Sequence, residues 1–231
     1  MSVHLQREIE KIKKSTLSLC ALVEEQVQLA VRALLDRDAE LARRVEARDV
    51  EIDHREVEVE EECLKALALH QPVASDLRLI VAVLKIDNDL ERIGDLAVNI
   101  ARKAVAFSAQ PPRPSGGWYP IPFDLAGMCQ KTQSMLRDSI DALVNLDAPL
   151  AHSVCGRDNE VDQMKRENRK KAEELMRSEP ERSAALLNLL AASRNLERIA
   201  DHATNIAESA IFVAAGRDVR HSRPAGDDTS L

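Results

Sequence analysis

The segment DNDLERIGDLAVNIARKA, residues 87–104, carries polar side chains at a helical spacing. Glu91, Asp95 and Asn99 follow one another at intervals of four residues, beside an apolar stripe that includes Leu90 and Ile93. Residues four apart share one face of an α-helix, so the two carboxylates are expected to stand one turn apart. Like charges at that spacing destabilise a helix by roughly a few tenths of a kcal/mol. A single pair of this kind on a charged helix is usually solvated surface, so the pattern carries weight only where it recurs.

Carboxylate pairs at this spacing occur in both halves of the chain. A shift of 109 residues aligns 33–53 with 142–162, with 11 of 21 positions identical, and a shift of 106 aligns 90–101 with 196–207, with nine of 12 identical. This is an internal duplication, and both copies keep the pairs. The pairs are Asp49 and Asp53 with Glu91 and Asp95 in the first half, and Asp158 and Asp162 with Glu197 and Asp201 in the second; Asn99 and Asn205 flank them.

Two such pairs on neighbouring helices would bring four carboxylates together. They cannot all stay ionised without compensation, because each negative charge disfavours ionisation of the others. One explanation is an arginine network that fixes the helix register, with the bases Arg48, Arg92, Arg157 and Arg198. The other is a multinuclear metal site, since carboxylate oxygens bind Fe, Mn, Mg, Ca and, less selectively, Zn. The residues alone leave both explanations open.

Other patterns for metal sites and catalysis are incomplete or absent. Glu51 and His54 have the Glu-x-x-His spacing of ferritin-like di-iron bundles, which need two such motifs. The second copy has Gln163 in place of the histidine, so the ferritin-like interpretation fails. The sequence contains no GxxxxGK[ST], GxSxG, HExxH or GxGxxG motif. With seven glycines in all, the chain is not expected to form phosphate-cradling loops.

Three long helices are expected to position the first set of carboxylates. Apolar periodicity predicts them at about 4–36, 38–70 and 75–107, with Ser75 or Asp76 as the N-cap of the third. Residues 108–123 contain five of the nine prolines and a Gly-Gly pair, which predicts a linker. Its rings, Trp118 and Tyr119, are expected to pack the linker against the helices.

The duplication predicts a second unit of the same kind. We expect an all-α chain of two tandem repeated three-helix bundles, at 1–107 and 124–215, packed with pseudo-two-fold symmetry. The change of shift from 109 to 106 predicts a shorter connection between the second and third helices of the second bundle. The polar residues 216–231 are expected to form a disordered tail.

Composition agrees with a helical protein of the cytoplasm. Aromatic residues make up only 2% of the 231 residues, which favours helix packing over a β-rich core. The net charge of -7 argues against a general nucleic-acid binder. No apolar stretch is long enough to insert into a membrane, and the charged N-terminus does not resemble a signal peptide. The four cysteines, which have no CxxC spacing, are expected to be thiols in or near the core.

The segments NDLERIGDLAVNIARKA and NLERIADHATNIAESAIFV, each preceded by an RDxEVD-like motif, resemble the PhoU family of bacterial phosphate-regulation proteins. The resemblance covers about 5–214. It implies Fe or Zn clusters bound through the four carboxylate pairs, with Asn99 and Asn205 as flanking candidates. It also implies a homodimer that represses the phosphate-starvation response. Such a protein would act as an adaptor between the ATPase subunit of the Pst phosphate ABC transporter and a sensor histidine kinase, at the inner face of the membrane.

Two alternatives remain from the sequence. The first is a helical bundle that stores or buffers metal without a link to phosphate. The second is a carboxylate-metal enzyme such as a phosphatase. The three possibilities differ in partner binding, in metal stoichiometry and in turnover of a phosphoester.

Overall fold

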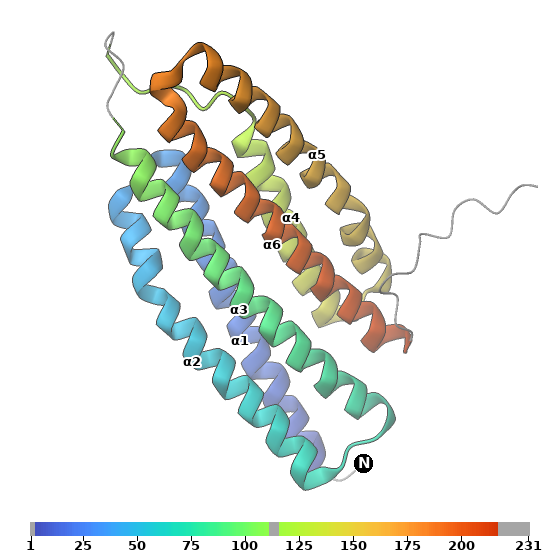
Figure 1. The fold of residues 1–231 in the computed structure, drawn as a ribbon. Helices are drawn as coiled ribbons and strands as arrows, with labels where there is room; N and C mark the ends of the chain where they lie inside the picture. The colour runs from blue at the N-terminus through green and yellow to red at the C-terminus, as the bar shows by residue number, and fades with distance from the viewer. Residues whose placement is uncertain (1–2, 111–115, 217–231) are drawn as a thin grey trace, which may run out of the picture.

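The computed structural model describes residues 3–110 and 116–216, which form two three-helix bundles that lie side by side (Figure 1). No strand occurs among these residues, so the expected all-α architecture is confirmed. Short connections join successive helices within each bundle. The first bundle contains α1 (Val3–Asp36), α2 (Ala39–His70) and α3 (Ala74–Ser108). The second contains α4 (Leu125–Asn145), α5 (Ala148–Ser178), a 3₁₀ turn η1 (Pro180–Arg182) and α6 (Ser183–Ala215).

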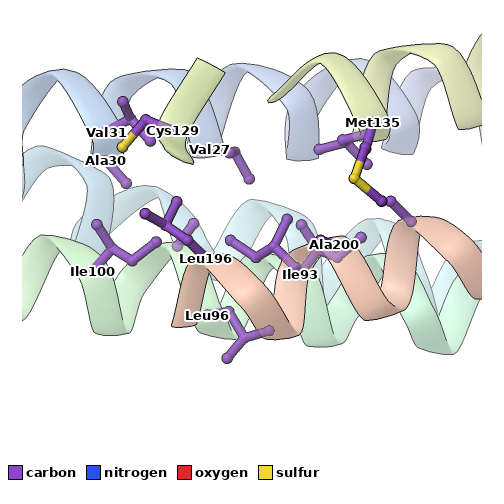
Figure 2. Packing of buried hydrophobic residues seen from close by; sticks show 14 of the residues in the cluster. Val27, Ala30, Val31, Ile93, Leu96, Ile100, Cys129, Met135, Leu196 and Ala200 are labelled. Carbon is purple, nitrogen blue, oxygen red and sulfur yellow. The ribbon is translucent and has the colours of Figure 1, made fainter. Parts of the chain in front are cut away.

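The two bundles share one hydrophobic core. The contact between α3 and α6 is the most extensive between any two elements of the described chain. Buried side chains from α1, α3, α4 and α6 belong to the same cluster, and Figure 2 shows Val27, Ile93, Met135 and Leu196 among them. Burying this shared apolar surface stabilises the bundles against each other as well as internally.

The turn between the first two helices is repeated in both bundles. Asp38 accepts hydrogen bonds from the amides of Glu40 and Leu41 at the start of α2, and Asp147 accepts one from Leu150 at the start of α5. Aspartate at the N-cap satisfies amides that have no partner within the helix. Because these turns are equivalent, α2 and α5 begin at equivalent points of their bundles. Their carboxylate pairs therefore occupy equivalent positions along the two helices.

Two local predictions are wrong. The residue before α3 is Val73, which makes no side-chain cap, so neither Ser75 nor Asp76 is the N-cap. The connection after α5 is also not the shorter one: residues 179–182 are outside α-helix there, against 71–73 in the first bundle. The second bundle is three residues shorter here, and the shortening falls on the helices. α6 begins three positions later in the repeat than α3, and η1 stands where α3 has its first turn.

The first bundle extends beyond the second at one end. α1 has 34 residues and its equivalent α4 has 21. A separate small core fills the extension, with Ile12, Val59, Cys63 and Ile80 among its members. The cysteines are free thiols, three of them buried and Cys155 partly buried, as expected. None of the helices in the described residues is long and apolar enough to cross a membrane.

The described part of the linker packs through its aromatic rings. The Arg37 guanidinium lies 4.9 Å from the centre of the Trp118 ring, and that of Arg182 lies 4.7 Å from the Tyr119 ring. Arg37 also donates to the backbone oxygen of Tyr119 at 2.8 Å. These contacts confirm that Trp118 and Tyr119 fasten the linker to the helices. The expected disordered tail lies outside the described residues beyond Gly216.

Candidate functional site

The structure brings the carboxylates of α2 and α3 to a common line between the two helices. We call Asp49, Asp53, Glu91 and Asp95 the first acidic seam. Burial raises the pKa of Asp49, and the charges of Asp53 on its own helix and Asp95 on α3 raise this pKa further. The pKa of Glu91 is raised by burial and by Asp95. The two predicted pairs therefore interact across the helix interface.

The second bundle repeats this arrangement between α5 and α6. We call Asp158, Asp162, Glu197 and Asp201 the second acidic seam. Burial and the charges of Asp162 and Glu197 raise the pKa of Asp158. The pKa of Asp201 rises to about 6, first through burial and then through Glu197 and Asp158. The carboxylates predicted on neighbouring helices of the second bundle therefore lie near enough for their charges to affect one another's pKa.

Close packing and one hydrogen bond hold the first acidic seam. A Cβ at Gly94 would lie 3.3 Å from two side-chain atoms of Ile52 and 3.6 Å from Asp49 Oδ1, so the glycine permits α2 to approach α3 here. Gln26 on α1 donates from Nε2 to Asp49 Oδ1 at 2.8 Å. Gln26 is almost fully buried. α1 therefore also positions the carboxylate of Asp49, together with α2 and α3.

The predicted arginine network forms only in small part. Arg48 pairs with Glu25 on α1 at 2.7 Å, and Arg157 pairs with Asp138 on α4 at 2.6 Å. Both therefore turn away from the seams. Arg92 lies 3.3 Å from Glu91 and 3.7 Å from Asp95 at a half-exposed position. Ion pairs as exposed as these contribute little to stability, about 0–1 kcal/mol.

A lysine that the sequence analysis did not consider compensates the second acidic seam. Lys165 Nζ lies 2.5 Å from Glu197 Oε1 and 3.2 Å from Asp162 Oδ1, and thus bridges α5 and α6. These hydrogen bonds raise the pKa of Lys165 and keep its charge. A shift of 109 residues places Glu56 at the equivalent position of the first bundle. The alignment of the two halves alone therefore shows that a lysine replaces a glutamate at this position.

The flanking asparagines do not act alike. Asn99 accepts a long hydrogen bond of 3.5 Å from Arg102. Asn205 instead donates to Asp89 on α3 at 3.0 Å, across the boundary between the bundles. His202 lies 2.8 Å from the same Asp89 oxygen. Asn205 and His202 therefore link the bundles, and neither is bonded to the second acidic seam.

Asp87 extends the acidic line of α3 by one turn, at i-4 from Glu91. It is only 2% exposed, and its Oδ1 has no hydrogen-bond partner. Burial raises its pKa to about 8, and the charges of Glu56 and Glu60 contribute. Its equivalent in the second bundle is Ser193, which accepts a hydrogen bond from Asn168 at 3.2 Å. This buried position therefore has a hydrogen-bond partner in the second bundle, whereas one oxygen of Asp87 has none in the first.

The two seams fit a metal ion differently. In the first, carboxylate oxygens outnumber the nearby bases, and the buried Glu91 Oε2 has an ion pair with Arg92 at 3.3 Å but no well-formed hydrogen bond. This donor set suits a hard cation. In the second, Lys165 already supplies positive charge. Among residues 3–110 and 116–216, no three His, Cys, Asp or Glu side chains are arranged as a metal site, so binding would require the carboxylates to change rotamer.

Comparison with known proteins connects the fold and the carboxylate motifs. The family model described as the PhoU domain matches residues 16–104 and again 125–210. The phosphate-specific transport system accessory protein PhoU homolog of Pseudomonas aeruginosa is 38% identical over 96% of this chain and 89% of its own length. The corresponding protein of Escherichia coli is 33% identical over 93% of this chain and 86% of its own.

Solved structures agree with the sequence relatives. The crystal structure of PhoU from Pseudomonas aeruginosa matches 92% of this chain and 99% of its own, with a TM-score of 0.85 and 37% identity. The PhoU crystal structure from Streptococcus pneumoniae gives a TM-score of 0.78 at 27% identity, over 93% of this chain. Two matched domains, two acidic seams and relatives that align over nearly the whole chain lead to one conclusion: this chain belongs to the PhoU family.

Proposed function

We propose that this protein is a cytoplasmic accessory protein of a phosphate transport system and represses the phosphate-starvation response. The observation that carries this is near full-length similarity to proteins named as accessory proteins of phosphate-specific transport. In this proposal the chain is an adaptor and not an enzyme. Its helical surfaces contact the ATPase subunit of the transporter and a phosphate-sensing histidine kinase, and it acts as a homodimer.

An apolar stripe on α2 supports a protein-binding role. Val50, Val57 and Leu64 recur every seven residues, and each is about half exposed, at 58%, 49% and 52%. A seven-residue repeat keeps side chains on nearly one line of a helix. The equivalent positions of α5 are the polar residues Asn159, Arg166 and Glu173. We assign this stripe to contact with the transporter's ATPase subunit, since an apolar helical line is the kind of surface that packs against another helix.

The stripe is tested by placing a charge in its centre. Val57→Glu should weaken binding to the purified ATPase subunit at least tenfold, because a carboxylate would have to leave water on docking. Leu187→Glu is the matched control, since Leu187 is an equally exposed apolar residue on α6. Loss of binding in both variants, or in neither, would remove the stripe from the proposal.

We further propose that this protein binds metal through the paired carboxylates of an acidic seam. The first acidic seam has the stronger case, because its carboxylates have raised pKa values and few bases around them. A bound Fe or Zn ion, or another hard cation, would supply the positive charge that keeps these carboxylates ionised and α2 fixed against α3. Gln26 would orient Asp49 within that seam.

A deletion experiment separates this function from the alternatives. Removal of the gene should derepress phosphate-starvation genes, and the wild-type gene should restore repression. A metal-storage bundle would instead load and release metal with no effect on those genes. A metal-dependent phosphatase would hydrolyse a phosphoester only with metal added. Unchanged expression in the deletion strain would contradict the regulatory proposal.

A further inference from the structure

The two acidic seams are chemically unequal although the duplication made them from one ancestor. At the position of Lys165 in the second bundle, the first bundle has Glu56. Lys165 binds Asp162 and Glu197, whose equivalents in the first bundle are Asp53 and Glu91. The charge of Glu56 acts on the first acidic seam: burial and Asp95 raise the pKa of Glu91 and Glu56 adds to this, while burial and Glu60 raise the pKa of Glu56 and Asp53 adds to that. One repeat position thus carries opposite charge against the same acidic neighbours.

We propose that Lys165 is a tethered cation that occupies the second acidic seam in place of a metal ion, so that divalent ions bind only in the first bundle. The ammonium group bridges one carboxylate from α5 and one from α6, which is the role a bound ion would have there. The inference rests on the metal-binding part of the proposed function.

The surroundings of the second seam agree with an internal counter-ion. Lys165 is about one-third exposed and Glu197 only 14% exposed, so the ion pair lies partly out of water. A charge-assisted hydrogen bond in such a place is stronger than one at the surface. A divalent ion would have to displace the ammonium and leave it without acceptors. Its binding would therefore be opposed both by lost hydrogen bonds and by repulsion between cations.

The buried polar position one turn before the seam glutamate differs between the bundles as well. In the first bundle it is Asp87, whose Oδ1 has no hydrogen-bond partner. In the second it is Ser193, which accepts a hydrogen bond from Asn168. The second bundle therefore satisfies this position with its own side chains, whereas the first leaves a buried acceptor unpaired.

The test isolates the second bundle by disabling the first. A background variant, Glu91→Gln with Asp95→Asn, removes the first-seam acids on α3. Mn²⁺ is then titrated against the background alone and against the background with Lys165→Glu, Lys165→Gln or Lys165→Arg, and the loss of the free Mn²⁺ electron paramagnetic resonance signal is measured. Lys165→Glu should bind at least tenfold more tightly than the background, and Lys165→Gln less strongly but measurably. Lys165→Arg, which keeps the cation, should bind no better than the background.

A second readout covers poor folding of the variants. In otherwise wild-type protein, Lys165→Gln should lower the melting temperature, and Mn²⁺ should restore it more than it raises that of Lys165→Arg. The proposal is overturned if the background already binds Mn²⁺ in the second bundle, or if neither Lys165→Glu nor Lys165→Gln gains binding or metal-dependent stability.

The reciprocal change separates this inference from the metal proposal itself. Glu56→Lys in the wild-type chain should abolish Mn²⁺ binding to the first bundle, because it copies the second bundle's cation. If the wild type and the first-seam background bind equally little metal, the metal part of the proposed function fails. The gain in the Lys165 variants still decides whether Lys165 keeps metal from the second seam.

Discussion

Asp89 on α3 accepts a hydrogen bond from Asn205 on α6 and lies 2.8 Å from Nδ1 of His202 on the same helix. Asp89 and His202 are both largely buried, at 15% and 19% exposed. The repeat equivalents, Asn195 and Leu96, cannot form the same pair. The bundles are therefore joined by a polar contact that exists on only one side of the pseudo-two-fold axis, in addition to the ion pair between Arg137 on α4 and Glu24 on α1.

The contact between the bundles predicts that the protein becomes less stable when His202 is removed. His202→Ala should lower the free energy of unfolding by about 1–2 kcal/mol, because it leaves the partly buried Asp89 with one fewer partner. His152→Ala on α5 is the control, since His152 is exposed. Chemical denaturation of both variants measures the difference. Equal stability of the two would show that the Asp89 contact does not hold the bundles together.

Gln26 predicts a second stability effect, inside the first bundle. Gln26→Met introduces the residue found at the equivalent position 135 and removes the donor to Asp49. We expect a loss of about 1–2 kcal/mol, because hydrogen bonds to a charged carboxylate exceed ordinary ones in strength. Gln28→Met, on the exposed side of the same helix, should change stability by less than about 0.5 kcal/mol. A variant at Gln26 as stable as the wild type would contradict the assigned role.

Asp87 predicts how stability depends on pH. Its pKa is raised from 3.8 to about 8 in the folded protein, by burial and by Glu56 and Glu60. The folded state therefore holds a proton that the unfolded state releases between about pH 4 and pH 8, so the contribution of Asp87 to stability falls as the pH rises through this window. Asp87→Asn mimics the protonated form. It should stabilise the protein more at pH 8.5 than at pH 5, measured by urea denaturation at both values. Identical pH profiles of stability for the wild type and Asp87→Asn would show that Asp87 is ionised in the folded protein at neutral pH.

The linker contact predicts a local effect on proteolysis. Arg37 stacks 3.6 Å from the Phe107 ring centre and donates to the backbone of Tyr119. Arg37→Ala should accelerate chymotrypsin cleavage after Trp118 several-fold, because the cation–π contacts and the hydrogen bond that order this segment are lost. Arg32→Ala, which removes an exposed arginine near the end of α1, should leave the cleavage rate unchanged.

The fold was predictable because periodicity and duplication both act over long stretches of sequence. Helix boundaries agree within a few residues, and the equivalent caps Asp38 and Asp147 follow from the repeat. The carboxylate placement was also predictable, since spacing fixes the face of a helix. The length of the connection after α5 was not predictable. A three-residue deletion can shorten either the connection or the flanking helix, and here α6 is the shorter element.

The partners of the carboxylates were harder to predict than their positions. Arg48 and Arg157 directly precede Asp49 and Asp158 in sequence, yet adjacent residues of a helix point about 100° apart, so both arginines meet another helix. Lys165 reaches the second seam because it lies three residues after Asp162, on the same face. For these residues, the base that pairs with a seam carboxylate is therefore one that shares its helix face, three residues away, and not one next to it in sequence.

The central claim, that the first acidic seam binds metal, is tested most directly by elemental analysis of protein purified without a tag or chelator. The wild type is compared with two matched variants, Asp95→Asn and Asp201→Asn, which change equivalent positions of the two seams. We predict bound Fe or Zn in the wild type, a loss of that metal in Asp95→Asn, and unchanged content in Asp201→Asn. Absence of metal from the wild type, or equal loss in both variants, would contradict the account.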